Sequence, residues 1–418
     1  MARRFIILCA VSGTLLVPGS AVGAPADDRS TCADVSGDVA IAACSRLIAS
    51  GRLRGGELAK AYYFRGVEYR DKGDLDRAIA DLGQAIRLDP KFALAYNNRG
   101  LAWDDKGEID RAIADYNEAI RLDPQSALPY SNRGFIAHRK GDLDRAFADY
   151  DEAIRLDSKF AQAYYRRGLA WLDKGELDRA LADYTEALEL NPLPKSTTHV
   201  NVYVDRGTIW RAKGDLDRAI ADYNDAIRFD PKYAAAYRAR GDAWRDKGGA
   251  NIERALADYK EAIRLDPKDS SAYRSRAVTY LYNGDAAKAL ADVNQASELD
   301  PKDAYVALWM EIVGQRNGVA SRLEQAIAKF DMTKWPGPVL RLLLGQLTPA
   351  AALAAADAPD AKKKNDRICE ATFYGGIVAL RTGAKDDAAK LYRAAVDACP
   401  RDVIEWYAAR AELKELGQ

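Results

Sequence analysis

Arginine and aspartate recur along this 418-residue chain in two regular series. Both series fall on apolar stripes of helical spacing, since Arg99 lies between Tyr96 and Trp103 and Asp115 lies between Ala112 and Ala119. A buried charge is costly unless it is paired. We therefore predict a ladder of Arg–Asp ion pairs, which form either within one copy of a repeated segment of the chain or with the adjacent helix. The alternative is that the arginines form a stripe along a binding surface. The ladder residues are Arg65, Asp81, Arg99, Asp115, Arg133, Asp149, Arg167, Asp183, Arg206, Asp222, Arg240, Asp258, Arg276 and Asp292.

Residue sets that support catalysis are missing from the sequence. There are two histidines, His138 and His199, and the chain has no HExxH motif, no nucleophile elbow and no phosphate-binding glycine loop. Acidic residues are abundant, but they return at the same positions in copy after copy, whereas a catalytic site needs to occur once. We predict no enzymatic activity, no catalytic residues, no metal site and no cofactor.

The cysteines form two close pairs outside the first residues of the chain. They are Cys32 with Cys44 and Cys369 with Cys399. An even number of cysteines in an exported chain indicates disulfides, and the sequence contains no CxxC motif for metal binding. We predict both disulfides; the alternative is four buried thiols.

The first 26 residues have the pattern of a secretory signal peptide. Arg3 and Arg4 precede an apolar run from Phe5 to Pro18, and an Ala-Pro-Ala sequence ends at Ala26. This run is shorter than the about 20 residues that cross a bilayer, and no later stretch is apolar enough. We predict cleavage near Ala26, a periplasmic or secreted protein, and no transmembrane span in the mature chain. The alternative is an uncleaved anchor.

Net charge does not indicate nucleic acid binding, because 62 basic and 62 acidic residues cancel. We predict no nucleic acid partner.

The arginines belong to a repeat of about 34 residues, and such a period is typical of a solenoid. Apolar residues within each copy follow helical spacing twice, which predicts two amphipathic helices per repeat. A Lys-Gly-Asp turn separates the helices, as at Gly73, and Asp-Pro ends the second one, as at Pro90. We expect an all-α protein.

The repeat resembles the tetratricopeptide repeat (TPR) through Tyr96, Gly100, Trp103, Ala112, Tyr116, Ala119 and Pro124. This resemblance implies a TPR α-solenoid: a right-handed superhelix of antiparallel helix pairs with N- and C-terminal caps. It also implies a concave groove lined by residues three before, one after and four after the glycine of each first helix. These are Tyr63, Asn97, Asp104, Phe135, His138, Tyr165, Arg211, Arg238, Asp242, Arg245 and Arg274.

The later groove positions are cationic, which suits an extended or helical peptide with acidic character. The alternative is an ordinary solvated face.

Five segments are predicted along the chain. They are a signal peptide (1–26), an N-terminal cap with one helix (27–58), seven repeats (59–303), a degenerate helical region with an Ala/Lys-rich linker (304–365), and a TPR-like hairpin with a capping helix (366–418). Five extra residues around 193–198 lengthen one connection. The last hairpin lacks two expected aromatics, so we expect weaker packing there. Its sequence resembles the end of NlpI-type envelope TPR proteins, which implies an adaptor role.

The sequence thus predicts a non-enzymatic, exported TPR scaffold that binds one or more envelope proteins or peptides through its groove. The alternative is a glycan-binding module in peptidoglycan or polysaccharide assembly, with Tyr63, Phe135 and Tyr165 as stacking platforms.

Overall fold

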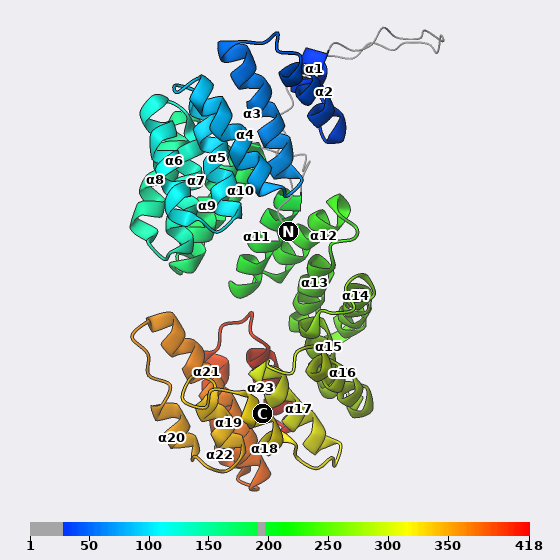
Figure 1. Cartoon of the computed structure of the whole chain (residues 1–418). Coiled ribbons are helices and arrows are strands. Elements are labelled where there is room, and N and C mark those ends of the chain that lie inside the picture. Colours follow the sequence, from blue (N-terminus) through cyan, green and yellow to red (C-terminus); the bar gives the residue numbers. More distant parts are fainter. Residues whose placement is uncertain (1–27, 191–196) are drawn as a thin grey trace, which may run out of the picture. The chain divides into compact units, whose positions relative to one another are not determined.

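The computed structural model describes residues 28–190 and 197–418, and its regular elements in these ranges are all helices (Figure 1). The chain divides into two compact units, Met1–Ser196 and Thr197–Gln418. This division falls in the lengthened connection, of which residues 191–196 lie outside the described part. The predicted signal peptide also lies outside it. None of the helices in the described ranges is long and apolar enough to cross a membrane.

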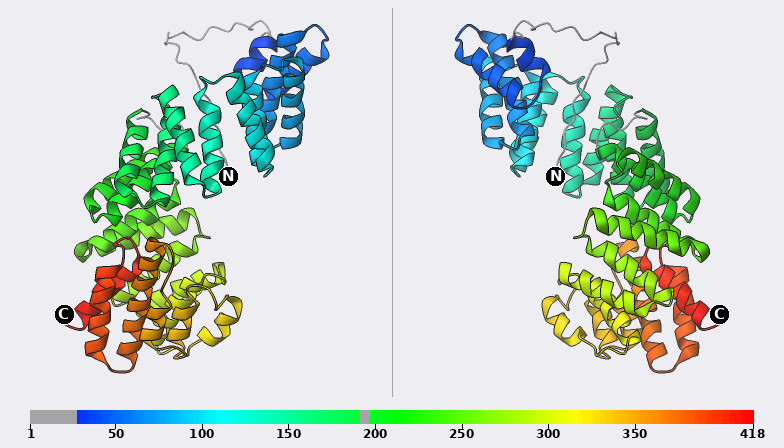
Figure 2. Two further views of the ribbon diagram at one scale, coloured as in Figure 1. Left: turned by 90° about the vertical axis from the view of Figure 1, so that its left-hand side faces the viewer. Right: turned by 90° about the vertical axis from the view of Figure 1, so that its right-hand side faces the viewer.

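Unit 1 contains a short N-terminal cap and four antiparallel helix pairs (Figure 2). The cap comprises α1 (Asp28–Asp34) and α2 (Asp38–Ala49). The pairs are α3 (Gly55–Asp71) with α4 (Leu75–Leu88), α5 (Ala93–Asp105) with α6 (Ile109–Leu122), α7 (Ala127–Arg139) with α8 (Leu143–Leu156), and α9 (Ala161–Asp173) with α10 (Leu177–Leu190).

Unit 2 begins with three more helix pairs of the same kind. They are α11 (Thr197–Ala212) with α12 (Leu216–Phe229), α13 (Ala234–Lys247) with α14 (Ile252–Leu265), and α15 (Ser270–Tyr282) with α16 (Ala286–Leu299). The two-residue insertion in the second pair forms a 3-10 turn, η1 (Gly249–Asn251).

The rest of unit 2 is also helical. It contains α17 (Ala304–Arg316), α18 (Leu323–Ala326), η2 (Ile327–Lys329), α19 (Gly337–Leu343), α20 (Pro349–Ala354), α21 (Ala361–Arg381), α22 (Lys385–Ala398) and α23 (Ile404–Glu415). The predicted polar linker is shorter than expected, because the lysines at 362–364 belong to the first turn of α21.

The turn inside each pair follows from a glycine and the acidic residue after it. Gly73 has φ 81°, which costs glycine nothing because it has no Cβ. Asp74 then accepts a hydrogen bond from the backbone N–H of Arg77 and caps α4. Glu108 takes the same place before α6 but makes no side-chain cap. The shorter aspartate therefore caps this turn where the longer glutamate does not.

The two helices of a pair pack through a glycine and a tyrosine. A Cβ built on Gly100 would lie 2.7 Å from Cε1 of Tyr116, whose side chain is fully buried. The same contact recurs between Gly134 and Tyr150, Gly168 and Tyr184, Gly207 and Tyr223, Gly241 and Tyr259, and Gly376 and Tyr392. This close approach explains why the glycine belongs to the repeat.

The C-terminal hairpin is more tightly packed than the sequence predicted. Phe373, Tyr374 and Tyr392 are fully buried and join Trp309 in one large hydrophobic cluster. The prediction was wrong because it compared the hairpin with other repeats, whereas the surrounding helices α17, α19 and α23 supply the missing apolar contacts.

Candidate peptide-binding surface

Seven bidentate ion pairs connect the first and second helices of the seven repeats. Arg99 donates from Nε and Nη2 to Oδ2 and Oδ1 of Asp115, at 2.8 and 2.7 Å. The same geometry joins Arg65 to Asp81, Arg133 to Asp149, Arg167 to Asp183, Arg206 to Asp222, Arg240 to Asp258, and Arg276 to Asp292.

These pairs are internal to the scaffold. The aspartates are 5–8% exposed, and each arginine lies 5.5–6.0 Å from the ring centre of the tyrosine three positions before it. The hydrogen bond to Asp115 raises the pKa of Arg99 above its ordinary value. The charge of each ladder arginine is thus neutralised by an aspartate within the fold. The two N–H groups of each bidentate bond are therefore not available to a ligand.

Two disulfides join the cysteine pairs of the described chain. Cys32 is bonded to Cys44 and ties α1 to α2, and Cys369 is bonded to Cys399 and ties the start of α21 to the end of α22.

Neighbouring first helices of unit 1 are connected by polar side chains about one repeat apart. Asn132 donates to the Oδ1 atom of Asn97 at 3.0 Å, and Asn97 is 4% exposed. Arg139 lies 2.7 Å from the carboxylate of Asp104, and Nε2 of His138 lies 2.8 Å from the carboxylate of Asp173. Of the predicted groove residues, Asn97, Asp104 and His138 therefore already have partners within the array.

The three predicted aromatic platforms are also in contact with other side chains. The ring of Tyr63 lies 4.9 Å from that of Phe92, and Tyr165 lies 5.8 Å from Tyr184. Phe135 has the guanidinium carbon of Arg166 4.9 Å from its ring centre. The described contacts leave no open row of ring faces.

Arg166 differs from the other arginines of this unit. Six arginines in residues 28–190 are partly buried, and five of them form an ion pair with an aspartate at 2.6–3.1 Å. Arg166 instead donates from Nη1 to three neutral acceptors at 3.0 Å: the carbonyl oxygen and Oγ of Ser131, and Oδ1 of Asn132. Burial lowers the pKa of this guanidinium.

Two buried hydroxyl groups accompany Arg166. The side chains of Tyr116 and Tyr150 are fully buried, and their OH groups have no hydrogen-bond partner in the described part of the chain. Burial raises the pKa of both tyrosines, and the positive charge of Arg166 acts in the opposite direction on each. Near Arg166 there are therefore two buried hydroxyl groups without a hydrogen-bond partner in the described residues. The guanidinium itself is hydrogen-bonded to neutral acceptors.

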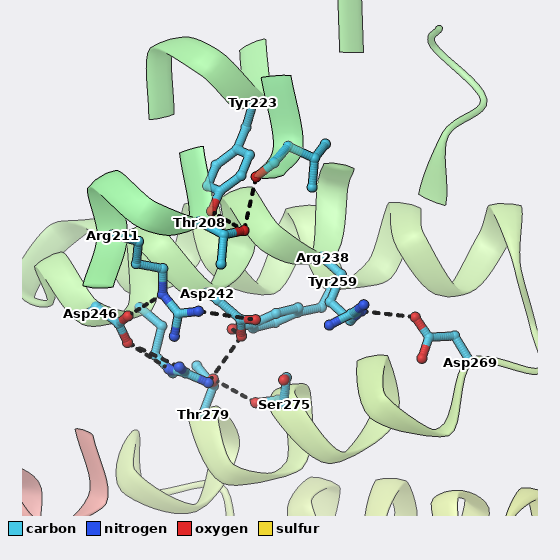
Figure 3. A network of polar contacts seen from close by, with 12 residues as sticks. Thr208, Arg211, Tyr223, Arg238, Asp242, Asp246, Tyr259, Asp269, Ser275 and Thr279 are labelled. Atoms are coloured by element: carbon cyan, nitrogen blue, oxygen red, sulfur yellow. Dashed lines mark hydrogen bonds and ion pairs between the residues drawn. The ribbon is translucent and has the colours of Figure 1, made fainter. Parts of the chain in front are cut away.

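The predicted cationic groove of unit 2 is not an open cationic surface. Arg211 donates to Asp246 at 2.6 Å, and Arg245 lies 3.1 Å from Asp242 and 3.0 Å from Asp246 (Figure 3). Tyr259 donates to Asp242 at 2.8 Å. Arg211, Asp242 and Arg245 are 6%, 7% and 1% exposed, so they form a buried ion cluster.

The remaining two predicted cations are paired as well. Arg238 lies 3.0 Å from Asp269, and Arg274 lies 3.4 Å from Asp303 (Figure 3 shows the first pair). The prediction failed because Arg211, Arg238 and Arg274 each pair with an aspartate of the following segment. Arg245 pairs with two aspartates of its own helix, Asp242 and Asp246. Burial alone would lower the pKa of Arg211, and the carboxylates of Asp246 and Asp242 raise it above its ordinary value.

Comparison with known proteins identifies the repeat. Models described as "Tetratricopeptide repeat" match residues 63–127, 161–192 and 258–291, and a model described as "TPR repeat" matches residues 136–175 and 207–248. The chain is a TPR protein. No curated protein matches it.

Several solved structures are similar to parts of this chain. The Cut9–Hcn1 complex of APC/C is similar with a TM-score of 0.52 at 16% identity, over 68% of this chain and 53% of that one. YrrB, described as a TPR protein with an unusual peptide-binding site, has a TM-score of 0.38 at 25% identity, over 46% of this chain and 95% of that one. A TPR protein from Parabacteroides merdae has a TM-score of 0.45 at 21% identity, over 61% and 98%.

Membership of this family supports a scaffold for protein–protein interaction, since TPR arrays present extended binding surfaces and are generally not catalytic. The NlpI-type resemblance of the C-terminal part stays a prediction.

One set of equivalent positions on the first helices was not predicted from the sequence. Asn98, Asn132 and Arg166 stand two positions before the glycine in three consecutive repeats, a position that was not counted as groove-lining. Asn98 donates to the hydroxyl oxygen of Tyr63 at 3.2 Å and accepts from Arg70 at 3.2 Å. Comparing the residues at this position in the three repeats would have identified Arg166, because it is a cation where the two preceding repeats have asparagine.

Proposed function

We propose that this TPR protein is an exported, non-catalytic scaffold of the bacterial cell envelope. In this proposal, it binds an extended segment of a partner protein on the first helices of unit 1, α3, α5, α7 and α9. The observation that carries the proposal is Arg166, the partly buried arginine of this unit whose hydrogen bonds go to neutral acceptors and which forms no ion pair in the described residues, although the charge of Asp104 acts on it.

A carboxylate on the partner would complete this arrangement. A desolvated guanidinium gains more from an opposite charge than an exposed one does, because the surroundings screen the interaction less. The three bonds to neutral acceptors all come from Nη1, so Nε and Nη2 remain able to donate to a ligand. An Asp or Glu side chain of an extended peptide has the geometry to accept from both.

Apolar contact beside this set of positions supports a peptide ligand. Leu94 lies one helical turn before Asn98 on α5, and its side chain is 44% exposed. A peptide that reached from Leu94 towards Arg166 would combine an apolar anchor with a charge.

Export is supported by the N-terminal pattern of the sequence and by the two disulfides, which persist in oxidising compartments. The test is the intact mass of the protein recovered from the periplasmic fraction. A mass that matches a chain starting at Asp27, and that is lower than the mass of the reduced chain by four hydrogens, supports export. A full-length chain in the cytoplasm with five free thiols contradicts it.

Glycan binding is less well supported, because Tyr63, Phe135 and Tyr165 each pack against another side chain. A stacking platform for sugars needs an exposed ring face.

Covalent capture tests the proposed surface. A photoreactive amino acid at position 94 is introduced into the full chain, which is incubated with envelope extract and irradiated. Protein adducts that are lost with Arg166→Gln and kept with Arg87→Gln support the proposal; Arg87 is an exposed arginine on α4. Adducts that survive Arg166→Gln would contradict it, and retention on peptidoglycan without protein adducts would favour the glycan-binding alternative.

A further inference from the structure

An open cavity of about 430 Å³ lies between the second and third repeats of unit 1, where α6 meets α7 and α8. Its apolar wall is formed by Ile113, Ile136 and Ala137, and the long side chains of Lys140 and Arg145 also line it. Pockets of roughly 300–1,000 Å³ are typical of ligand binding. This cavity is therefore large enough to hold a side chain of a partner.

Ala137 is an exception among the equivalent positions of the seven repeats. The other six repeats have an aromatic residue here, and a basic residue near the start of the following helix lies 4.4–5.3 Å from its ring centre. These pairs are Tyr69 with Arg77, Trp103 with Arg111, Trp171 with Arg179, Trp210 with Arg218, Trp244 with Arg254, and Tyr280 with Lys288. In the third repeat the basic residue is Arg145, and Ala137 supplies no ring for it. The cavity thus lies at the position where the other repeats have an aromatic side chain.

The next interface along the array is a filled copy of this site. Ile113, Ala137, Lys140 and Arg145 correspond, 34 positions later, to Phe147, Trp171, Lys174 and Arg179. The rings of Phe147 and Trp171 stack with their centres 3.9 Å apart. Nζ of Lys174 and the guanidinium carbon of Arg179 lie 5.6 and 4.6 Å from the centre of the Trp171 ring. An indole therefore occupies this place when the chain itself supplies one.

The cations at the open site lack the ring that their counterparts cover. The side chain of Arg145 is 84% exposed and lies 3.2 Å from Asp142. In three filled repeats the counterpart of Arg145 forms the same i, i+3 ion pair and is 61–66% exposed. Lys140 is half-exposed and lies 3.6 Å from Asp110. The face of an aromatic ring is negative and attracts such cations, so the charge at this cavity favours an aromatic ligand over an aliphatic one.

We propose that this cavity binds an aromatic side chain of a partner protein, and that tryptophan fits it best. The indole packs against Ile113 as Trp171 packs against Phe147, and Lys140 and Arg145 cover its ring. The preference for tryptophan follows from the chain's own use of it in four of the six filled repeats. This inference goes beyond the proposed function, which concerns the carboxylate bound by Arg166, and either can fail without the other.

The test is a titration of the full chain with labelled isoleucine methyl groups, followed by nuclear magnetic resonance. The methyl groups of Ile113 and Ile136 line the cavity and report on it directly. The probes are two pentapeptides of glycine with blocked ends and a central Trp or Leu, and free indole. We expect the tryptophan pentapeptide to shift both methyl signals in a saturable way. It should bind at least about 5-fold more tightly than the leucine pentapeptide.

Three variants locate the binding. Ala137→Trp supplies the missing ring from the chain itself and should abolish the shifts on titration. Ala114→Trp adds an indole at an exposed position of α6 that does not line the cavity, and it should leave the shifts unchanged. Arg145→Gln should weaken the binding roughly 3-fold, and it keeps the test decisive if Ala137→Trp does not fold.

Several results would overturn the proposal. They are an absence of shifts in the wild-type chain, equal binding of the two pentapeptides, shifts that persist in Ala137→Trp, and an unchanged affinity in Arg145→Gln. Shifts caused by free indole and not by the tryptophan pentapeptide would assign the cavity to a small aromatic compound, and they would equally contradict the docking of a partner protein.

Discussion

Arg240 pairs with Asp258 across 18 positions, two more than in the other repeats, and its bonds to the carboxylate are still 2.8 and 2.6 Å. The two extra residues are absorbed by η1 in the turn, while the helices keep their contact. The ion pair is therefore tied to the packing of the helices and not to the spacing in the sequence.

Removing this pair should destabilise unit 2. Asp258→Ala leaves Arg240 partly buried without its carboxylate, and we expect a loss of about 2–4 kcal/mol in the free energy of unfolding, somewhat below a fully buried pair. Glu261→Ala on the same helix is the matched control, because its bidentate pair with Arg264 is exposed and should contribute less than about 1 kcal/mol. Urea unfolding followed by circular dichroism compares them. Equal losses would contradict an internal role for the ladder.

The glycine of the helix pair should not tolerate a methyl group. A Cβ on Gly168 would lie 2.5 Å from Cε1 of Tyr184, so Gly168→Ala should cost about 1–3 kcal/mol through overpacking. Gly83→Ala places a Cβ 3.7 Å from Nη1 of Arg99 in a helix interior, and it should stabilise by about 0.5–1 kcal/mol. Melting temperatures report the sign, and a neutral Gly168→Ala would contradict the close contact.

The two disulfides should contribute unequally. Replacing Cys369 and Cys399 with serine opens a loop of 30 residues, against 12 for Cys32 and Cys44. The chain-entropy account predicts that each disulfide contributes about 2–4 kcal/mol to the free energy of unfolding, and that the disulfide closing the longer loop contributes roughly 0.8 kcal/mol more. Thermal unfolding of the two double variants measures the difference. A larger loss for the shorter loop would show that local packing outweighs the loop term.

Unit 2 should lose stability as the pH rises above about 5. Burial, together with the neighbouring carboxylate of Glu405, raises the pKa of Glu370 to about 8, while bonds from Trp335 and Tyr305 act in the opposite direction. Between the ordinary value near 4.3 and about 8, the folded state holds a proton that the unfolded state releases. Stability is therefore fully present below the ordinary pKa and falls until the pH passes about 8.

Glu370→Gln should reduce this slope, because glutamine keeps an acceptor for Trp335 and does not ionise. Some slope should remain, since burial also raises the pKa of Glu405 and of Glu412. The urea midpoints of the wild type and of Glu370→Gln at pH 5.5, 7 and 8.5 measure the slope of stability against pH. Identical slopes for the wild type and the variant would mean that Glu370 is ionised in the folded protein.

Periodic features of the molecule could be predicted because each is repeated. The glycine turn, the helix pairs and the Arg–Asp series depend on contacts inside one repeat, where fixed spacing determines fixed geometry. The capping helix predicted within residues 366–418 was also found, at Ile404–Glu415.

Contacts between distant segments could not be predicted in this way. The cluster of Arg211 with Asp246 joins neighbouring repeats, and the contact of Arg245 with Tyr407 joins residues 162 positions apart. Neither leaves a periodic signal, so the sequence showed cations at groove positions without the groups that neutralise or cover them. Arg166 was missed for a different reason, since what distinguishes it is that its hydrogen bonds go to neutral acceptors and not to a carboxylate.

The most direct test of the account is a selection of random 12-residue peptides on the immobilised full chain. We predict that the enriched peptides carry an Asp or Glu at one shared position. We also predict that their affinity falls at least 10-fold with Arg166→Gln and changes less than 2-fold with Arg87→Gln, in line with the loss of a desolvated charge pair. Enriched peptides without an acidic residue, or equal binding to the Arg166→Gln chain, would contradict the central claim that this arginine reads a carboxylate on the partner.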